Sequence, residues 1–326
     1  MPAVYVDDVT VLPRIPVLKD RAVRDGGLRD RPVHSVVSAP RFLEGEGFEV
    51  RRAFAELDLS LADPFLLLDH LGAVEYSPGE AKGAPDHPHR GFETVTYMMD
   101  GELEHRDSNG GGGLITDGAT QWMTAGAGIV HSEMPTEHLV TKGGLFHGVQ
   151  LWVNLPSADK WTPPQYQDLE ADSSVLLASD DGGAMVRLIA GDLAGHKGPG
   201  STRTPITYAH ASISPGARLQ VPWPADFNAL VYVMAGDGAV GPERRPIREG
   251  QLAVFGDGDA ITVYGDPKQD NGLPQMEVLL LGGRPIRERI AWYGPFVMNT
   301  QDELYQAVND YHAGRMGSIP AKRADE

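Results

Sequence analysis

The sequence predicts an all-β protein made of two similar sandwich- or barrel-type domains, followed by one short helix. Short β-rich runs predict the strands, an internal repeat predicts the two domains, and one stretch of helical periodicity predicts the helix. Helical patterning is otherwise scarce, and 39 glycines and 25 prolines punctuate the chain. Closely spaced short strands are typical of β-sandwiches and β-barrels. Clear examples are the runs at 93–99, 230–234 and 276–281.

The internal repeat relates one segment in each half of the chain. ETVTYMMDG at 93–101 aligns with NALVYVMAG at 228–236, which places Tyr97 over Tyr232. Further on, ITDG at 115–118 resembles IREG at 247–250, with a shorter loop before it in the second copy. A repeat of this length predicts two domains of the same fold.

The predicted helix covers 301–312, QDELYQAVNDYH, where Leu304, Val308 and Tyr311 recur at helical spacing after Thr300, the expected N-cap. Residues 1 to about 30 and the tail after Ala313 show no periodicity, which predicts loosely ordered extensions. The segment PSADKWTPPQ at 156–165 is rich in proline and polar residues, as a domain linker would be.

Length and composition limit the class of protein. The 326 residues exceed the roughly 250 to 300 at which one hydrophobic core stops growing, which favours two domains. A net charge of −17 repels a phosphate backbone and argues against direct nucleic-acid binding. The chain lacks an apolar run of membrane-spanning length and shows no secretory signal pattern, so we expect no membrane partner and a cytoplasmic location. It also lacks cysteine, so nitrogen and oxygen must hold any metal.

Two pairs of ligand-type side chains stand out. His87 and His89 are two residues apart, as are His131 and Glu133. In an extended segment this spacing puts both side chains of a pair on one face. Two such strands would offer three imidazole nitrogens and one carboxylate oxygen to one ion, with coordination positions left open. This set suits iron, manganese, cobalt, nickel, copper or zinc, and because the affinity order alone favours copper and zinc, it does not name the metal.

The repeat provides an internal control for this interpretation. A lone pair of histidines at this spacing is usually a metal-free strand or loop. In the second copy, Pro222 and Pro224 are expected opposite the first histidine pair. Val263 is expected opposite His131. The second copy therefore lacks all of these metal-donor side chains. This pattern predicts one divalent transition metal in the first domain and none in the second.

Four longer segments stand out beside these pairs: HPHRGFETVTY at 87–97, QWMTAGAGIVHSEMP at 121–135, QLWVNLP at 150–156 and GPFVMNT at 294–300. They resemble the pirin family, and the likeness runs from about residue 33 to residue 312. The chain departs from the wider cupin motifs at two points, because one extra residue stands before Gly101 and Gly126 replaces a proline.

The resemblance implies a bicupin, in which two tandem cupin barrels of jelly-roll type pack together and one iron, Fe(2+), lies in the N-terminal barrel. The family's metal ligands match His87, His89, His131 and Glu133. The expected division is an extension at 1–32, a metal-binding barrel at 33–160, a metal-free barrel plus helix at 161–312 and a tail at 313–326.

Other residues near these motifs have two possible roles each. Glu93 could orient a histidine or move a proton, or it could be a hydrogen-bonded polar group of the barrel interior. His105 could enter the site from the next strand, although a solvated strand end is more common. The large apolar side chains are expected to pack the barrel, and some of them to line a cavity: Phe92, Trp122, Met123 and Trp152.

The resemblance supports two functional hypotheses. The first is an iron-dependent dioxygenase that opens a flavonol such as quercetin with O2, with Glu133 as the base for the hydroxyl proton and Glu93 in reserve. The second is a metal-dependent regulatory protein that binds a protein partner without significant turnover. A sealed structural metal is a third possibility. An apolar cavity large enough for a flavonol would favour the enzyme, and a plugged barrel would favour the binding protein.

Overall fold

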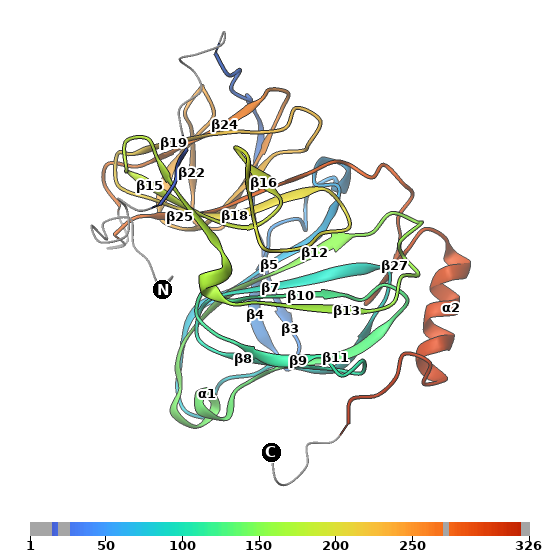
Figure 1. Cartoon of the computed structure of the whole chain (residues 1–326). Coiled ribbons are helices and arrows are strands. Elements are labelled where there is room, and N and C mark those ends of the chain that lie inside the picture. Colours follow the sequence, from blue (N-terminus) through green and yellow to red (C-terminus); the bar gives the residue numbers. More distant parts are fainter. Residues whose placement is uncertain (1–14, 19–26, 270–273, 321–326) are drawn as a thin grey trace.

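Two β-barrels packed against each other form this protein, with one helix beside the first barrel (Figure 1). The structure is a computed structural model, and it describes residues 15–18, 27–269 and 274–320. The predicted bicupin architecture with a C-terminal helix is confirmed.

The first barrel consists of a seven-stranded sheet and a four-stranded sheet. In spatial order, the strands of the larger sheet are β13 (Gln165–Leu169), β10 (Thr120–Thr124), β7 (Phe92–Asp100), β12 (Gly144–Asn154), β5 (Phe65–Tyr76), β4 (Phe48–Arg52) and β3 (Arg41–Glu44). Those of the smaller sheet are β6 (Ala84–His89), β11 (Ile129–Pro135), β8 (Leu103–Asp107) and β9 (Gly112–Ile115). The short helices are η3 (Leu59–Leu61) and α1 (Glu137–Lys142).

The second barrel has an eight-stranded and a four-stranded sheet. The larger sheet runs β1 (Val17–Leu18), β14 (Val175–Ser179), β15 (Ala184–Ala190), β18 (Ile206–Ile213), β25 (Met276–Gly283), β20 (Leu230–Ala235), β23 (Gln251–Phe255) and β2 (Val33–Ser38). The smaller one runs β19 (Arg218–Pro222), β24 (Ala260–Gly265), β21 (Asp237–Val240) and β22 (Arg245–Arg248). The remaining elements are η4 (Ala171–Ser173), the hairpins β16 (Asp192–Leu193) with β17 (His196–Lys197) and β26 (Ala291–Tyr293) with β27 (Phe296–Met298), and α2 (Gln301–His312).

Both barrels repeat one strand order, which confirms the internal repeat. The central strands β10-β7-β12-β5 correspond to β23-β20-β25-β18, and β6-β11-β8-β9 corresponds to β19-β24-β21-β22. Tyr97 and Tyr232 lie on the equivalent strands β7 and β20. The alignment that placed these two tyrosines together was therefore correct.

The sheet register corrects another part of that alignment. His131 on β11 pairs with His87 on β6, whereas Val263 on β24 pairs with Leu219 on β19. The counterpart of His87 is thus Leu219 and not Pro222.

By the same register, Val221 and not Pro224 corresponds to His89. The alignment erred because the second barrel has a longer connection between β19 and β20 than the first has between β6 and β7. Leu219, Val221 and Val263 are buried in an apolar core, so the second barrel still offers no donor atoms at these three positions.

Two strands belong to the barrel opposite to the one that the expected division at residues 33 and 160 gives them. β2 begins the segment expected to form the first barrel but pairs with β23 of the second. β13 follows the expected boundary but pairs with β10 of the first. Each barrel therefore completes its larger sheet with a strand from the segment expected to form the other barrel.

Three apolar clusters fill the interiors of the two barrels to different extents. The first fills the second barrel with side chains such as Val186, Val231 and Leu280. The second lies between the barrels and joins residues of both larger sheets, including Leu151 and Leu279. In the first barrel the third cluster occupies only part of the interior. The remaining space is the cavity described below.

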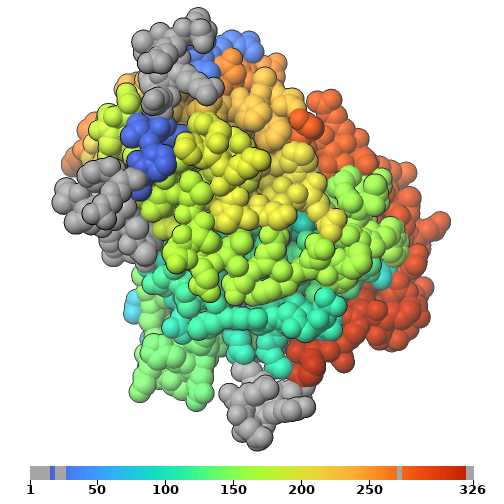
Figure 2. All heavy atoms as spheres, in the orientation of Figure 1, coloured from blue at the N-terminus to red at the C-terminus, as the bar shows by residue number. Residues whose placement is uncertain are grey.

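The C-terminal segment packs on the first barrel rather than on the second (Figures 1 and 2). The helix α2 covers the predicted residues, and Thr300 forms a capping box with Glu303. Leu304 and Ala307 of α2 are buried in a cluster with Val130 of β11. The chain after the helix also packs, since Met316 is buried in this cluster. The expected loose tail is wrong for residues 313–320.

The other segments expected to be loose are also packed where the structure describes them. Arg31 donates hydrogen bonds to the carbonyls of Gly256 and Pro224, which attaches residues 27–32 to the second barrel. Residues 1–14 and 19–26 lie outside the described residues. In the proline-rich linker, Lys160 is buried and donates to the carbonyl of Gly91 at 2.7 Å. No helix in the described ranges combines the length and apolar character needed to cross a bilayer.

Candidate metal centre

Three histidines meet inside the first barrel. The strands β6 and β11 are antiparallel neighbours, and their register places His87 opposite His131. The period of two along β6 puts His89 on the same face. The ring centroids lie 4.3 to 4.9 Å apart. One ligating nitrogen from each of these three side chains lies within 4.8 Å of the others.

Hydrogen bonds leave one nitrogen of each ring available. His87 Nδ1 lies 2.7 Å from the carbonyl oxygen of Pro85, and His89 Nδ1 lies 3.2 Å from that of Pro295. Because a carbonyl only accepts, both Nδ1 atoms must donate, and the Nε2 atoms carry lone pairs. His131 Nε2 is buried and has no hydrogen-bond partner among the described residues.

Burial lowers the pKa of His89 and of His131 well below the usual value, and the neighbouring imidazoles act in the same direction. Both rings are therefore neutral near pH 7, which is the form that binds metals. A buried nitrogen without a partner, beside two others with free lone pairs, fits a metal ion. Nitrogen donors of this kind suit a transition metal rather than magnesium or calcium.

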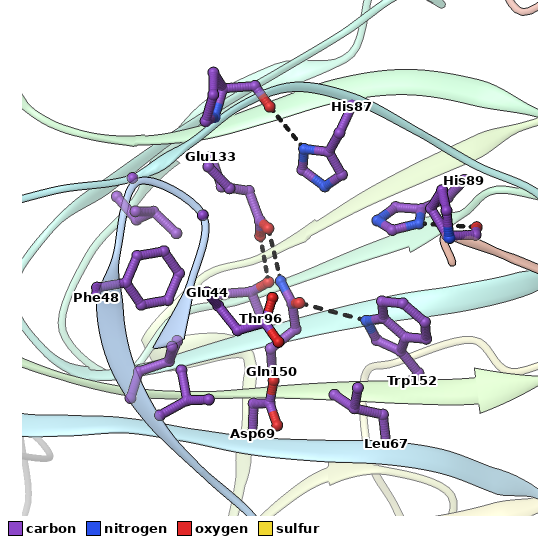
Figure 3. A pocket seen from close by; sticks show the side chains of 18 of the residues that line it. Glu44, Phe48, Leu67, Asp69, His87, His89, Thr96, Glu133, Gln150 and Trp152 are labelled. Carbon is purple, nitrogen blue, oxygen red and sulfur yellow. Dashed lines mark hydrogen bonds between the residues drawn. The ribbon is translucent and has the colours of Figure 1, made fainter. Parts of the chain in front are cut away.

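Glu133 reaches the same cavity from β11, beyond a register irregularity that follows His131. Its two oxygens accept hydrogen bonds from Thr96 Oγ1 at 2.7 Å and from Gln150 Nε2 at 2.6 Å (Figure 3). Glu133 is not in the three-histidine group, but it forms a second possible metal group with His105 and His131. Each carboxylate oxygen keeps a further lone pair beyond the hydrogen bond that it accepts.

His105 lies behind His131 and does not line the cavity. Its Nδ1 is 3.4 Å from His131 Nδ1, and its Nε2 is 3.3 Å from the Asp107 carboxylate. It also stacks on Tyr166, with ring centroids 5.2 Å apart. The expected solvated strand end is wrong, because His105 is fully buried. Its contacts are those of a residue that orients a metal-binding histidine.

Glu93 faces the other side of the sheet. It accepts a hydrogen bond from Thr124 Oγ1 at 2.6 Å and borders a separate cavity together with Arg203. The period of two explains this position, since Thr96 points into the metal cavity and Glu93 lies three residues before it on β7. Burial raises the pKa of Glu93 to about 7. Glu93 therefore does not contact the candidate centre.

The metal cavity has a volume of about 730 Å³. Its walls are largely apolar, with Phe48, Leu67 and Trp152 among the lining residues (Figure 3). Trp152 packs on the buried Phe92, whereas Trp122 lies between the barrels. A cavity of this size fits a molecule with a few rings.

Polar residues that the sequence analysis missed also line this cavity. Arg52 donates to Asp69 at 2.8 and 2.6 Å and to Glu44 at 2.5 Å. Asp69 interrupts an apolar run, LLLDHLG, and that interruption could have identified it. Glu44 and Arg52 carry no such signal, because strand pairing brings them to the cavity.

The chain is similar to known proteins over most of its length. The pirin family model matches residues 47–153, and the model of the pirin C-terminal cupin domain matches residues 208–317. Human pirin is 40% identical over 283 residues, which cover 86% of this chain and 91% of that protein. A pirin-like protein from Solanum lycopersicum is 41% identical over 290 residues, covering 89% and 94%. The crystal structure of quercetin 2,3-dioxygenase from Acinetobacter baumannii superposes with a TM-score of 0.81 at 37% identity, covering 89% and 99%.

Proposed function

The chain belongs to the pirin family, and we propose that it is an iron-dependent dioxygenase that opens a flavonol such as quercetin. The observation that carries this proposal is the open, mostly apolar cavity beside three histidines. A plugged barrel would have favoured a protein that only binds partners. The likeness to a quercetin 2,3-dioxygenase over most of both chains supports the same choice.

In this proposal His87, His89 and His131 hold the ion, and Glu133 is the fourth ligand. An iron ion there would supply Lewis-acid and redox chemistry toward the flavonol and O2. The hydrogen bonds that free each Nε2 hold the rings in the ligand orientation before any ion binds. His105 supports His131 from behind.

Glu133 is also the proposed base for the flavonol hydroxyl. Its carboxylate lies in the cavity between the histidines and Gln150 (Figure 3). Gln150 and Thr96 fix both oxygens, which keeps the carboxylate aimed at the space a substrate would fill. Glu93 loses its role as the reserve base, because it faces another cavity.

The apolar walls position the substrate and exclude water. Trp152 and Leu67 offer faces against which flavonol rings can pack. Water exclusion strengthens the interaction between the Glu133 carboxylate and a hydroxyl. Asp69 and Glu44 can accept hydrogen bonds from hydroxyls elsewhere on the molecule.

Oxygen consumption tests the function directly. Protein with a verified iron content should consume O2 when quercetin is added, and the flavonol absorbance should fall with it. Protein stripped of metal is the control and should show neither change. No oxygen uptake with any flavonol would remove the dioxygenase assignment and favour the regulatory alternative.

The variant Glu133→Gln separates metal binding from proton transfer. An amide still offers a carbonyl oxygen to an ion but cannot accept the hydroxyl proton, so the rate should fall by roughly a hundredfold while most of the metal stays. The measurements are metal content and the O2-uptake rate of the same sample. A full rate in this variant would show that Glu133 is not the base.

A further inference from the structure

A buried carboxylate lies behind the candidate metal centre, at the end of β8. Asp107 and His105 are two residues apart on this strand, so they share one face. In the pairing of β8 with β11, Asp107 lies opposite His131 and His105 lies opposite Glu133. The side chains of Asp107 and His105 are almost fully buried. They therefore meet in a dry environment beside a proposed metal ligand.

The hairpin that follows β8 holds the Asp107 carboxylate in one orientation. Its Oδ1 accepts hydrogen bonds from the backbone N–H of Asn109 at 2.8 Å and from that of Gly111 at 2.9 Å. A Cβ at Gly111 would overlap the Oδ2 of Asp107, so glycine at this position leaves room for the carboxylate. The Oδ2 atom lies 3.3 Å from His105 Nε2. Each carboxylate oxygen thus has a separate set of partners.

These contacts determine which atoms of His105 and His131 carry a proton. Burial raises the pKa of Asp107, but hydrogen bonds from His105 and from the backbone of Gly111 and Asn109 outweigh it and hold the pKa below its usual value. Asp107 is therefore a carboxylate near pH 7, which only accepts hydrogen bonds. His105 Nε2 must then donate to it, and the Nδ1 of a neutral His105 keeps a lone pair.

The same reasoning continues to His131. Its Nδ1 lies 3.4 Å from His105 Nδ1, and because the His105 atom has the lone pair, the His131 atom must donate. A neutral imidazole has one N–H, so His131 Nε2 is left with a lone pair. This is the buried nitrogen that has no hydrogen-bond partner among the described residues.

We propose that Asp107 is a positioning residue, which sets the tautomer of His131 through His105 and so keeps His131 Nε2 free for a metal ion. His87 and His89 need no such chain of hydrogen bonds, because backbone carbonyls bind their Nδ1 atoms. The proposal rests on the proposed metal centre, and it holds whether or not that centre turns over a flavonol.

The variant Asp107→Asn should reverse the direction of these hydrogen bonds. Its amide oxygen should take the place of Oδ1, where two backbone N–H groups need an acceptor, so its NH2 group should face His105. His105 Nε2 must then accept and its Nδ1 must donate, which moves the proton of His131 from Nδ1 to Nε2. NMR shifts of the ring nitrogens in the metal-free full chain report this change. A wild-type His131 protonated at Nε2, or a variant still protonated at Nδ1, overturns the proposal.

Metal affinity gives an independent readout. Iron(II), titrated into the full chain without oxygen, should bind to Asp107→Asn roughly a hundredfold more weakly than to the wild type, a large effect for a residue that supports a ligand. Asp181→Asn is the matched control, because Asp181 also accepts from a backbone N–H in a hairpin turn, that of Gly183 in the second barrel. This control should bind iron as the wild type does. A wild-type affinity in Asp107→Asn would contradict the proposal.

Removing His105 separates the proposal from simple damage to the fold. His105→Phe keeps a ring against Tyr166, but this ring can neither donate nor accept, so no donor opposes the Nδ1–H of His131. Asp107→Asn with His105→Phe should therefore bind iron at least about fivefold more tightly than Asp107→Asn alone. Equal or weaker binding overturns the proposal. Additive damage would give that result, as would a role for His105 as a ligand in its group with His131 and Glu133.

These measurements also distinguish a failure of the metal centre from a failure of this proposal. A wild-type chain that binds no iron would remove the proposed metal centre. The tautomer of His131 in metal-free protein would still show whether Asp107 controls it.

Discussion

Single residues decide which atoms are available for chemistry at this site. The backbone carbonyls of Pro85 and Pro295 bind the Nδ1 atoms of His87 and His89, and these contacts select the tautomer that offers Nε2. His131 differs, because another histidine, His105, contacts its Nδ1. The three-histidine group therefore offers one nitrogen lone pair from each ring without a rearrangement of the rings.

His131→Ala should reduce the metal affinity by at least roughly ten- to a hundredfold, the loss expected even for a supporting residue. The reason is that His131 belongs to both possible ligand groups of the described residues. Metal content after dialysis against a weak chelator measures the effect. His138→Ala, at an exposed histidine of α1, is the control and should keep its metal. Full metal content in His131→Ala would contradict the assignment.

The glycine that replaces the usual proline of the cupin motif also has a local explanation. Gly126 has a φ of 48°, which proline cannot adopt because its ring holds φ near −65°. A Cβ at Gly126 would lie 2.2 Å from the carbonyl oxygen of Thr162. Glycine at position 126 therefore lets the linker residue Thr162 pack closely, and it changes none of the proposed metal ligands.

Glu93 should make stability depend on pH. Its pKa rises on folding from 4.5 to about 7, so the folded chain holds a proton that the unfolded chain releases. This stabilisation is complete below pH 4.5 and is lost as pH rises through about 7, by on the order of 3 kcal/mol. Glu93→Gln should remove that dependence and be the more stable protein at pH 8, as urea unfolding at several pH values would show. Glu56→Gln, at an exposed glutamate, should change nothing, and a pH profile unaltered by Glu93→Gln would refute the explanation.

At the scale of elements, the C-terminal hairpin and helix complete the metal cavity. β26 and the turn after it supply Trp292, Gly294 and Pro295 to the cavity lining. The helix α2 holds this hairpin against the barrel, and Asp310 pairs with Arg90 at 2.8 Å. Arg90 directly follows the proposed ligand His89. The helix α2, the last in the sequence, thus supports β6, the strand that carries His87 and His89.

Thr300→Ala should loosen this helix by about 1 kcal/mol, the usual effect of losing an N-cap side chain. The Thr300 hydroxyl accepts from the backbone of Glu303, and the Glu303 carboxylate accepts in return. Hydrogen exchange of α2 should become about fivefold faster. Thr141→Ala in α1, where the threonine is exposed and is not a cap, is the control. Unchanged exchange in α2 would mean that packing alone holds the helix.

For the whole molecule, the packing of the two larger sheets divides the roles of the barrels. Their shared core contains Tyr97 and Tyr232, the two repeat residues. Tyr97 also donates a hydrogen bond to His210 Nδ1 of the second barrel at 2.8 Å. The second barrel is filled with apolar side chains and supports the first, which keeps a hollow interior with polar groups.

The purified protein should therefore hold close to one metal atom per chain, with none in the second barrel. Leu219, Val221 and Val263 stand where the first barrel has its three histidines, and aliphatic side chains bind no ions. Metal analysis of the wild type and of a His87→Ala, His131→Ala double variant measures this. A double variant that retains half or more of the metal would place an ion elsewhere in the chain.

The sequence by itself determined the fold class, the repeat, the helix with its cap and the three histidines that meet. These properties are local or periodic. A spacing of two on a strand brings His87 and His89 to one face, whatever surrounds them. Helical spacing and the capping residues of α2 lie within a dozen consecutive positions. The resemblance then added the bicupin architecture over most of the chain.

Only the tertiary structure decided where each sheet ends and what surrounds the histidines. The exchange of β2 and β13 depends on pairing between segments far apart in sequence, which no local pattern encodes. The position of Glu93 could not be predicted either. One face of β7 lines the metal cavity and the other does not, and the sequence does not show on which face Glu93 lies. Arg52 and Asp69 meet because β4 and β5 pair. Burial also shifts the pKa of a side chain such as Glu93. The degree of burial depends on all the neighbours of that side chain, which only the tertiary structure brings together.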